Sequence, residues 1–269
     1  MARTKVNGVE LYYEVHGVGP AVLGIHGTPS TAVMWEDAAG ELAAVGRCVI
    51  YDRRGFGRSE RPEPFDAVDL ATHVEDAAAL LEELQAVPAV VIGRSTGGQI
   101  ALALAHTRPE TVRALVLLEP ALLSIDPEGV AYADRLRHVI LRTADDDLSR
   151  AAEAVCRDVL GDAAWESFPE ELRQMFADTS PAVLAEVRGR GLDLSEDALV
   201  LHVEDLARMD QPTLLVSAED SPEPLRRVTA RLADALPRTE SVLVPGGHLI
   251  YPADPAVLDF VSRVVAGSG

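Results

Sequence analysis

The sequence predicts an α/β protein built on a mostly parallel sheet that helices cover on both faces. Short, continuously apolar segments alternate along the chain with amphipathic segments, which is the pattern of strands buried by crossover helices. One apolar segment, 89–92, runs through a glycine-flanked turn into an Ala/Leu-rich segment, which indicates a strand, a sharp turn and a helix. Between residues 121 and 206 the alternation stops, and this predicts a helical insertion.

The first expected element is a β-hairpin over residues 4–15, because Asn7-Gly8 is a favoured hairpin turn. The expected core strands then follow at 21–25, 48–51, 89–92, 114–118, 213–217 and 241–244. The expected helices lie at 66–86, 99–105, 223–235 and 255–266. Alternation of these two kinds of element predicts the parallel, doubly covered sheet.

Residues 121–206 contain amphipathic helical segments instead of strands. The breaks between these segments fall at Pro127, Gly161, Pro169 and Pro181. We expect this region to form a helical lid on a core that consists of residues 1–120 and 207–269. The chain has no repeat or low-complexity linker that would separate a second autonomous domain.

Composition narrows the class of substrate and the compartment. With 24 Lys and Arg against 43 Asp and Glu, the formal charge is −19, which disfavours nucleic acid and anionic membrane surfaces as partners. A small neutral or apolar substrate fits better. Two distant cysteines, Cys48 and Cys156, offer neither a disulfide framework nor metal-ligand spacing. Without a signal-like or membrane-spanning apolar segment, we expect a cytoplasmic protein.

Ser95 occupies the bend between the predicted strand and helix. Gly93 and Gly97 lack a Cβ where strand and helix must nearly touch, so Ser95 can hold a strained backbone with its hydroxyl exposed. The following helix directs its N-terminal N–H groups at the same point. The alternative for the pentapeptide alone is an ordinary helix N-cap serine.

Polar groups follow the other predicted strands as well. The carboxyl ends of parallel strands meet at one edge of a sheet, where functional groups collect. The groups expected at this edge are Ser95, His26, Asp52, Glu119, Asp220 and His248.

Four motifs in their chain order identify a family resemblance. They are the turn His26-Gly27-Thr28-Pro29, the loop 52–59, the elbow Gly93-x-Ser95-x-Gly97 and the late Gly247-His248. With these motifs the chain resembles the α/β-hydrolase superfamily over nearly its whole length.

The resemblance implies a role for each matching residue. Ser95 would be the nucleophile and His248 its base, with the backbone N–H groups of Thr28 and Thr96 as the oxyanion hole. His26 would support the oxyanion loop. Asp52 and its basic neighbours are expected to form a rigid turn with salt bridges.

The acid that orients the histidine departs from the commoner family pattern. Many relatives carry it after the seventh strand, but here Ser221 stands where that aspartate is expected. Glu119 ends the sixth strand at the same sheet edge, which resembles certain dehalogenases and a lactone hydrolase. Asp220, one residue before the expected position, remains the alternative.

The leading hypothesis is a serine hydrolase that cleaves an ester or lactone through an acyl-enzyme, with the lid shaping an apolar pocket. This chemistry requires no metal and no organic cofactor. A serine at the elbow disfavours haloalkane dehalogenase and epoxide hydrolase chemistry, for which relatives use aspartate. Carbon–carbon bond hydrolysis of a diketone and a non-catalytic binder are the alternatives. Trp35, Tyr132 and Trp165 are candidates to contact the substrate.

Overall fold

An eight-stranded sheet forms the centre of the computed structural model, which describes residues 2–267. Its strands are β1 (Ala2–Val6), β2 (Val9–His16), β3 (Ala21–Ile25), β4 (Arg47–Tyr51), β5 (Ala89–Arg94), β6 (Val112–Leu118), β7 (Thr213–Ala218) and β8 (Thr239–Val244). Their order across the sheet is β1-β2-β4-β3-β5-β6-β7-β8. Strands β3 to β8 are parallel, and β2 pairs antiparallel with both β1 and β4. The predicted α/β fold with a mostly parallel sheet is confirmed.

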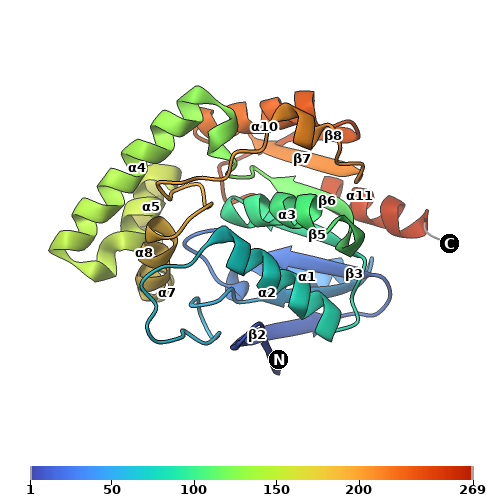
Figure 1. The fold of residues 1–269 in the computed structure, drawn as a ribbon, viewed down its shortest axis with the longest axis horizontal. Helices are drawn as coiled ribbons and strands as arrows, with labels where there is room; N and C mark the ends of the chain where they lie inside the picture. Colours follow the sequence, from blue (N-terminus) through green and yellow to red (C-terminus); the bar gives the residue numbers. More distant parts are fainter. Residues whose placement is uncertain (1, 268–269) are drawn as a thin grey trace.

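Helices cover both faces of the sheet (Figure 1). They are α1 (Glu36–Leu42), α2 (Leu70–Glu83), α3 (Thr96–Thr107), α4 (Pro127–Asp146), α5 (Ala151–Leu160), α6 (Asp162–Ser167), α7 (Glu170–Asp178), α8 (Ser180–Arg188), α9 (Val203–Leu206), α10 (Glu223–Ala235) and α11 (Pro255–Ala266). The apolar side chains of α2, α3 and α10 pack on one face, and those of α1 and α11 pack on the other. Strand side chains alternate between these two cores, as the pleat requires.

The N-terminal hairpin has the turn that its sequence predicts. Val6 pairs with Val9, and the two turn residues, Asn7 and Gly8, have φ values of 45° and 78°. Positive φ at both positions is the geometry of a type I′ turn, which matches the right-handed twist of the flanking strands. The hairpin adds the two antiparallel strands at one edge of the sheet.

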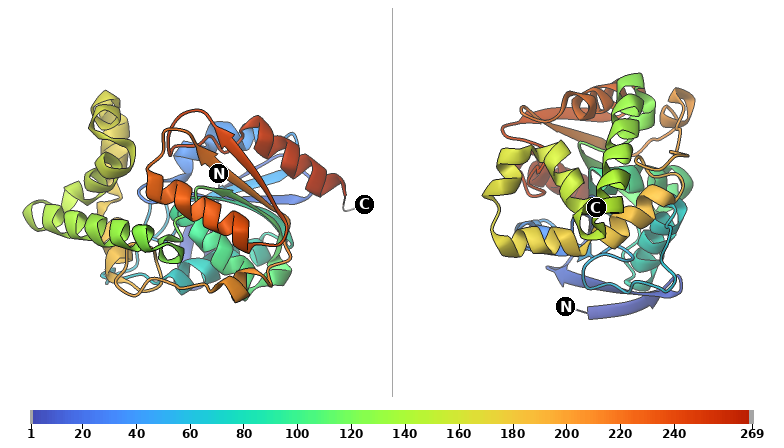
Figure 2. Two further views of the ribbon diagram at one scale, coloured as in Figure 1. Left: turned by 90° about the horizontal axis from the view of Figure 1, so that it is seen from above. Right: turned by 90° about the vertical axis from the view of Figure 1, so that its left-hand side faces the viewer.

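The segment between β6 and β7 is helical, and its helices α4 to α8 gather at one end of the sheet (Figures 1 and 2). Asp126 joins this helical group to the core. Its carboxylate accepts from the Glu128 N–H at the start of α4 and lies 3.1 Å from Arg227 and 3.2 Å from Arg231 of α10. Hydrogen bonds from Arg227 hold the pKa of Asp126 at about 2, against the effect of burial.

Two regions differ from the sequence-based expectation. Helix α1 was not predicted, because its seven residues include Gly40 and carry only a short apolar pattern. Helix α2 is shorter at both ends than the predicted 66–86. Within residues 2–267, no helix is both long enough and apolar enough to span a membrane.

The backbone after α8 lies against the segment that leads into α2. Val68 N–H donates to Ala185 O and Leu70 N–H to Arg190 O, each at 2.9 Å. Gly189 lies between these two bonds, and a Cβ added there would collide with the Val68 carbonyl group. The close approach of the helical segment to the core at this point therefore requires glycine.

We expect Gly189→Ala to lower the free energy of unfolding by roughly 1–3 kcal/mol, because two backbones must separate to admit the methyl group. Gly40→Ala is the matched control, since its added Cβ meets nothing within 4 Å in an exposed helical position. It should raise stability by roughly 0.5–1 kcal/mol. Urea unfolding of both variants measures this, and equal stabilities would contradict the steric argument.

Candidate active site

Ser95 lies at the sharp bend between β5 and α3. Its backbone has φ 55° and ψ −122°, a conformation that a residue with a side chain rarely adopts. The bend brings strand and helix so close that a Cβ at Gly93 would collide with the Gly97 carbonyl, and a Cβ at Gly97 with that of Ile25. Ser95 N–H donates to Leu118 O at 3.1 Å, which fixes the bend against β6.

His248 lies in the loop after β8 and contacts a buried glutamate. Its Nδ1 is 2.7 Å from Oε2 of Glu119, the residue that follows β6 with φ 45°. The carboxylate also accepts from the Ala218 N–H at 2.9 Å and from the Ser221 hydroxyl at 2.6 Å. A carboxylate only accepts hydrogen bonds, so Nδ1 carries a proton, and in the neutral imidazole Nε2 is then the acceptor.

Asp220, the alternative partner for His248, is exposed. Its backbone N–H donates to Gly246 O at 2.9 Å. Within residues 2–267 its carboxylate makes neither a hydrogen bond nor an ion pair. Of the two carboxylates that the sequence offered, Glu119 is the one in contact with the imidazole.

Ser95, His248, Thr28 and Thr96 line one small cavity of about 20 Å³, called here the Ser95 cavity. Its other walls are Ala121, Leu123, Tyr132, Leu136, Val155, Val159, Asp193, Leu194 and Leu225. Val159 and His248 also line an outer cleft of about 520 Å³ between α5, α6 and the loop after β8. The strand ends and the helices α4 and α5 therefore enclose the Ser95 hydroxyl together.

The backbone N–H groups of Thr28 and Thr96 are free to bind an anion. Neither group donates to a protein acceptor in the described part of the chain. His26 holds the first of these loops, since its Nδ1 lies 2.9 Å from Gly27 O and its Nε2 accepts from the Arg53 N–H at 3.0 Å. Burial, reinforced by the Arg53 charge, lowers the pKa of His26 well below its usual value. The imidazole is thus neutral and structural.

The three aromatic residues proposed to contact the substrate lie in different places. Tyr132 lines the Ser95 cavity. Trp35 is buried in the core on the α1 face, where its ring fills the space that a side chain at Gly24 would need. Trp165 packs with Phe168 and Phe176 inside the helical segment. Neither tryptophan is among the residues that line the cavity.

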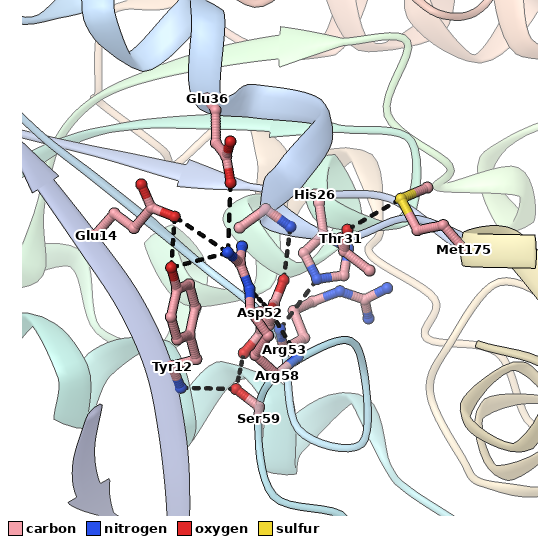
Figure 3. A network of polar contacts seen from close by, with 11 residues as sticks. Tyr12, Glu14, His26, Thr31, Glu36, Asp52, Arg53, Arg58, Ser59 and Met175 are labelled. Carbon is pink, nitrogen blue, oxygen red and sulfur yellow. Dashed lines mark hydrogen bonds and ion pairs between the residues drawn. The ribbon is translucent and has the colours of Figure 1, made fainter. Parts of the chain in front are cut away.

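Asp52 organises the loop after β4 (Figure 3). Its carboxylate accepts from the Ala32 N–H at 2.6 Å and from the Arg58 N–H at 2.8 Å, and the Arg58 Nε lies 3.1 Å away. The Ser59 hydroxyl donates to the Asp52 carbonyl at 2.5 Å and accepts from the Tyr12 N–H. Asp52 therefore has the structural role that the sequence predicted, a rigid turn with a salt bridge.

A buried ion pair joins this loop to the helical segment. Arg53 is paired with Glu186 of α8, and both side chains are almost completely buried. Glu186 also accepts from the Thr28 hydroxyl at 2.5 Å and lies 3.1 Å from His73 Nε2. Burial alone would raise the pKa of Glu186, but the Arg53 charge and the His73 contact bring it down to about 2. The pair thus holds the Thr28 loop in place.

Three residues at the site were not assigned a role from the sequence. Ser221 stands where many relatives carry the acid, and its hydroxyl donates to Glu119. Glu186 and Asp193 lie in the segment between β6 and β7, and neither belongs to a motif that would assign it a role. Their signal would have been a carboxylate within an otherwise apolar run, such as Glu186 in Ala-Val-Leu-Ala-Glu-Val.

We expect Glu186→Gln to lower the free energy of unfolding by about 3–5 kcal/mol, because it leaves the Arg53 charge buried without its partner. Glu10→Gln removes the acid of an exposed pair with Arg3 and is the control, since such pairs contribute little. Urea unfolding at neutral pH compares the two. A similar loss of unfolding free energy in both variants would show that breaking the buried pair costs no more than breaking an exposed one.

The sequence and the fold both match known hydrolases. A family model described as the alpha/beta hydrolase fold matches residues 20–255. The lipase LipV of Mycobacterium tuberculosis is 33% identical over 204 residues, which cover 74% of this chain and 72% of that protein. The uncharacterized hydrolase YraK of Bacillus subtilis is 36% identical over 121 residues, 45% of each chain.

Among solved structures, a thermophilic esterase from Thermogutta terrifontis superposes with a TM-score of 0.75 at 25% identity, covering 99% of this chain and 97% of the esterase. The family model spans most of the sequence, and the lipase match extends over more than two thirds of both chains. The chain belongs to the α/β-hydrolase family, and it is a hydrolase.

Proposed function

We propose that this hydrolase cleaves a carboxylic ester or lactone through an acyl-enzyme on Ser95. The observation that carries the proposal is that Ser95 and His248 line one cavity while Glu119 holds His248 Nδ1 at 2.7 Å. A serine hydroxyl needs a neighbouring base to attack a carbonyl at neutral pH, and the imidazole Nε2 is left free to act as that base.

The reaction follows from these groups in two steps. The Ser95 oxygen bonds to the substrate carbonyl carbon while His248 Nε2 takes the hydroxyl proton. The N–H groups of Thr28 and Thr96 then stabilise the oxyanion, each donor of this kind contributing about 10²–10³ in rate. The tetrahedral intermediate expels the alkoxide, which receives the proton from His248. Water repeats the sequence on the acyl-enzyme and releases the acid.

Glu119 is the proposed acid of this triad. Its carboxylate would fix the imidazole tautomer and stabilise the imidazolium that forms during the attack. The Ala218 N–H and the Ser221 hydroxyl hold the carboxylate in a buried position, so its orientation is set before the substrate binds. Asp220 has no such support, because its side chain faces solvent.

Residues 121–206 are the proposed lid. Helices α4 and α5 contribute Tyr132, Leu136, Val155 and Val159 to the Ser95 cavity, so the substrate would meet an apolar wall opposite Ser95. A cavity of about 20 Å³ holds little more than one water molecule, so the wall must move when a substrate enters. The outer cleft, which shares Val159 and His248 with this cavity, is the proposed route of entry.

Substitution of Ser95 by alanine should abolish ester hydrolysis and labelling by a fluorophosphonate probe, because the attacking oxygen is removed. Ser241→Ala is the control, since Ser241 is an exposed serine on β8. Activity on a panel of p-nitrophenyl esters, lactones and a diketone, together with gel detection of the probe, measures both effects. Hydrolysis by Ser95→Ala at the wild-type rate would refute the proposal, and turnover of the diketone alone would favour carbon–carbon hydrolysis.

The choice of acid is tested by two isosteric changes. Glu119→Gln should lower kcat by up to ~10⁴, the size of the equivalent loss in a serine protease, because the carboxylate no longer supports the imidazolium. Asp220→Asn should leave kcat close to wild type. Steady-state kinetics are compared after thermal denaturation has confirmed that both variants fold. The reverse pattern would assign the acid to Asp220.

A further inference from the structure

Asp193 is a buried carboxyl group in the Ser95 cavity that the proposed reaction does not use. It follows α8 in the chain, is 7% exposed, and lines the cavity together with Ser95 and His248. Within residues 2–267, no Lys, Arg or His side chain forms an ion pair with it. The hydroxyl of Thr96 lies 3.5 Å from its Oδ1, at the limit of a hydrogen bond. The carboxyl group is therefore held in the cavity without a charged partner.

The backbone around Asp193 is fixed relative to Ser95. Gln99, in the first turn of α3, donates from Nε2 to Gly191 O at 2.9 Å and accepts from the Asp193 N–H at 3.0 Å. The nitrogen and the oxygen of the Gln99 amide thus both bind the backbone of the loop that contains Asp193. Because α3 begins at the Ser95 bend, Gln99 fixes the backbone at Asp193 relative to this bend.

The remaining lid wall of the cavity is almost entirely apolar. Its side chains are Ala121, Leu123, Leu136, Val155, Val159 and Leu194, and Leu225 of α10 completes the apolar lining. Tyr132 adds a phenol whose hydroxyl is buried and makes no hydrogen bond of normal geometry in the described structure. Burial, and then the nearby Asp158 carboxylate, raise its pKa. Asp193 and Tyr132 are thus the two polar side chains that the lid presents to the cavity.

The surroundings of Asp193 favour its protonated form. Burial, and then the charge of Glu186 on α8, raise its pKa to about 7, although the backbone N–H groups of Asp193 and Leu194 and the charge of Arg53 after β4 act in the opposite direction. Tyr132 of α4, the Thr96 hydroxyl of α3 and His248 after β8 share the cavity with it. Near neutral pH the group exists in part as a neutral carboxylic acid, which both donates and accepts hydrogen bonds.

We propose that Asp193, together with the Tyr132 hydroxyl, binds a hydroxyl group of the substrate close to the scissile carbonyl, and so selects uncharged hydroxy esters or hydroxylated lactones. This inference rests on the proposed serine-hydrolase function. A substrate hydroxyl would supply the partner that the Tyr132 hydroxyl lacks, and it could bind Asp193 more closely than the Thr96 hydroxyl does at 3.5 Å. A plain alkyl group would leave the Tyr132 hydroxyl unsatisfied. A substrate carboxylate would be repelled by Asp193 once that group ionises.

The test compares three esters with the same leaving group: p-nitrophenyl butyrate, p-nitrophenyl 3-hydroxybutyrate and mono-p-nitrophenyl succinate. Wild type should prefer the hydroxy ester over the butyrate by at least about 10-fold in kcat/KM, as a site built to hydrogen-bond a substrate hydroxyl does. Asp193→Leu should bring this ratio close to one, and Tyr132→Phe should lower it. Asp197→Asn, an exposed carboxylate in the same loop, should leave the ratio unchanged.

A second measurement uses Asp193→Asn, which keeps the side-chain shape but cannot ionise. For wild type, the kcat/KM ratio of the succinate ester to the butyrate should fall from about pH 6 to about pH 8, as Asp193 loses its proton. For Asp193→Asn, the same kcat/KM ratio should be constant over this pH range. Any other ionising group that acts on the charged ester is present in both proteins, so the difference between wild type and Asp193→Asn isolates the contribution of Asp193. This measurement tests the role of Asp193 even if the Asp193→Leu variant does not fold.

The results distinguish a failure of the Asp193 proposal from a failure of the serine-hydrolase proposal. A wild-type ratio near one for the hydroxy ester, an unchanged ratio in Asp193→Leu, or the same pH trend in Asp193→Asn would overturn the role of Asp193 while ester hydrolysis stands. Absence of turnover with all three esters, together with absence of fluorophosphonate labelling at Ser95, would instead overturn the serine-hydrolase proposal.

Discussion

The close approach of three backbone segments at the end of β5 is the constraint on which the site depends. Gly93 and Gly97 let the chain reverse from strand to helix within four residues, and Gly97 lies directly against the end of β3. Ser95 can hold its strained φ of 55° only because these contacts and the hydrogen bond to Leu118 fix the segments on either side. The same contacts bring the Thr28 loop beside the Ser95 hydroxyl.

The helical insertion is tied to this core by charged side chains, although its packing is largely apolar. Glu186 reaches from α8 to Arg53 and the Thr28 hydroxyl, and Asp126 joins the start of α4 to α10. A buried pair such as Arg53–Glu186 adds little stability relative to an apolar pair of the same size, but removal of one partner leaves a buried charge and is costly. The helical segment between β6 and β7 therefore holds the Thr28 loop through Glu186, and its helices α4 and α5 contribute residues to the lining of the Ser95 cavity.

The sequence predicted those parts of the fold that depend on local patterns. Helices α10 and α11 begin and end at the expected residues, because their amphipathic periodicity is strong and prolines mark their first turns. Helix α1 was missed, since it is short and contains Gly40. At the site, the glycines around Ser95 indicated the bend directly. The partner of His248 could be narrowed only to two carboxylates, because the choice depends on where separate strands end.

Contacts made by the insertion could not be predicted at all. Arg53 and Glu186 are 133 residues apart in the chain, and Gln99 and Asp193 are 94 apart. Which helical residue meets which strand end depends on the path of the whole insertion, and amphipathic periodicity gives only the buried face of each helix. Buried carboxylates such as Asp193 therefore look like ordinary surface residues until the chain is folded.

The hydrogen bond from Ser221 to Glu119 shows what position 221 supplies beside a buried carboxylate. A carboxylate at this position would place two negative charges around one imidazole, and their repulsion would force one of them to keep a proton. The contact of Glu119 with His248 would then depend on which carboxylate held that proton. A serine adds no charge and contributes a donor instead, so Glu119 accepts from both the Ser221 hydroxyl and the Ala218 N–H while it contacts the imidazole.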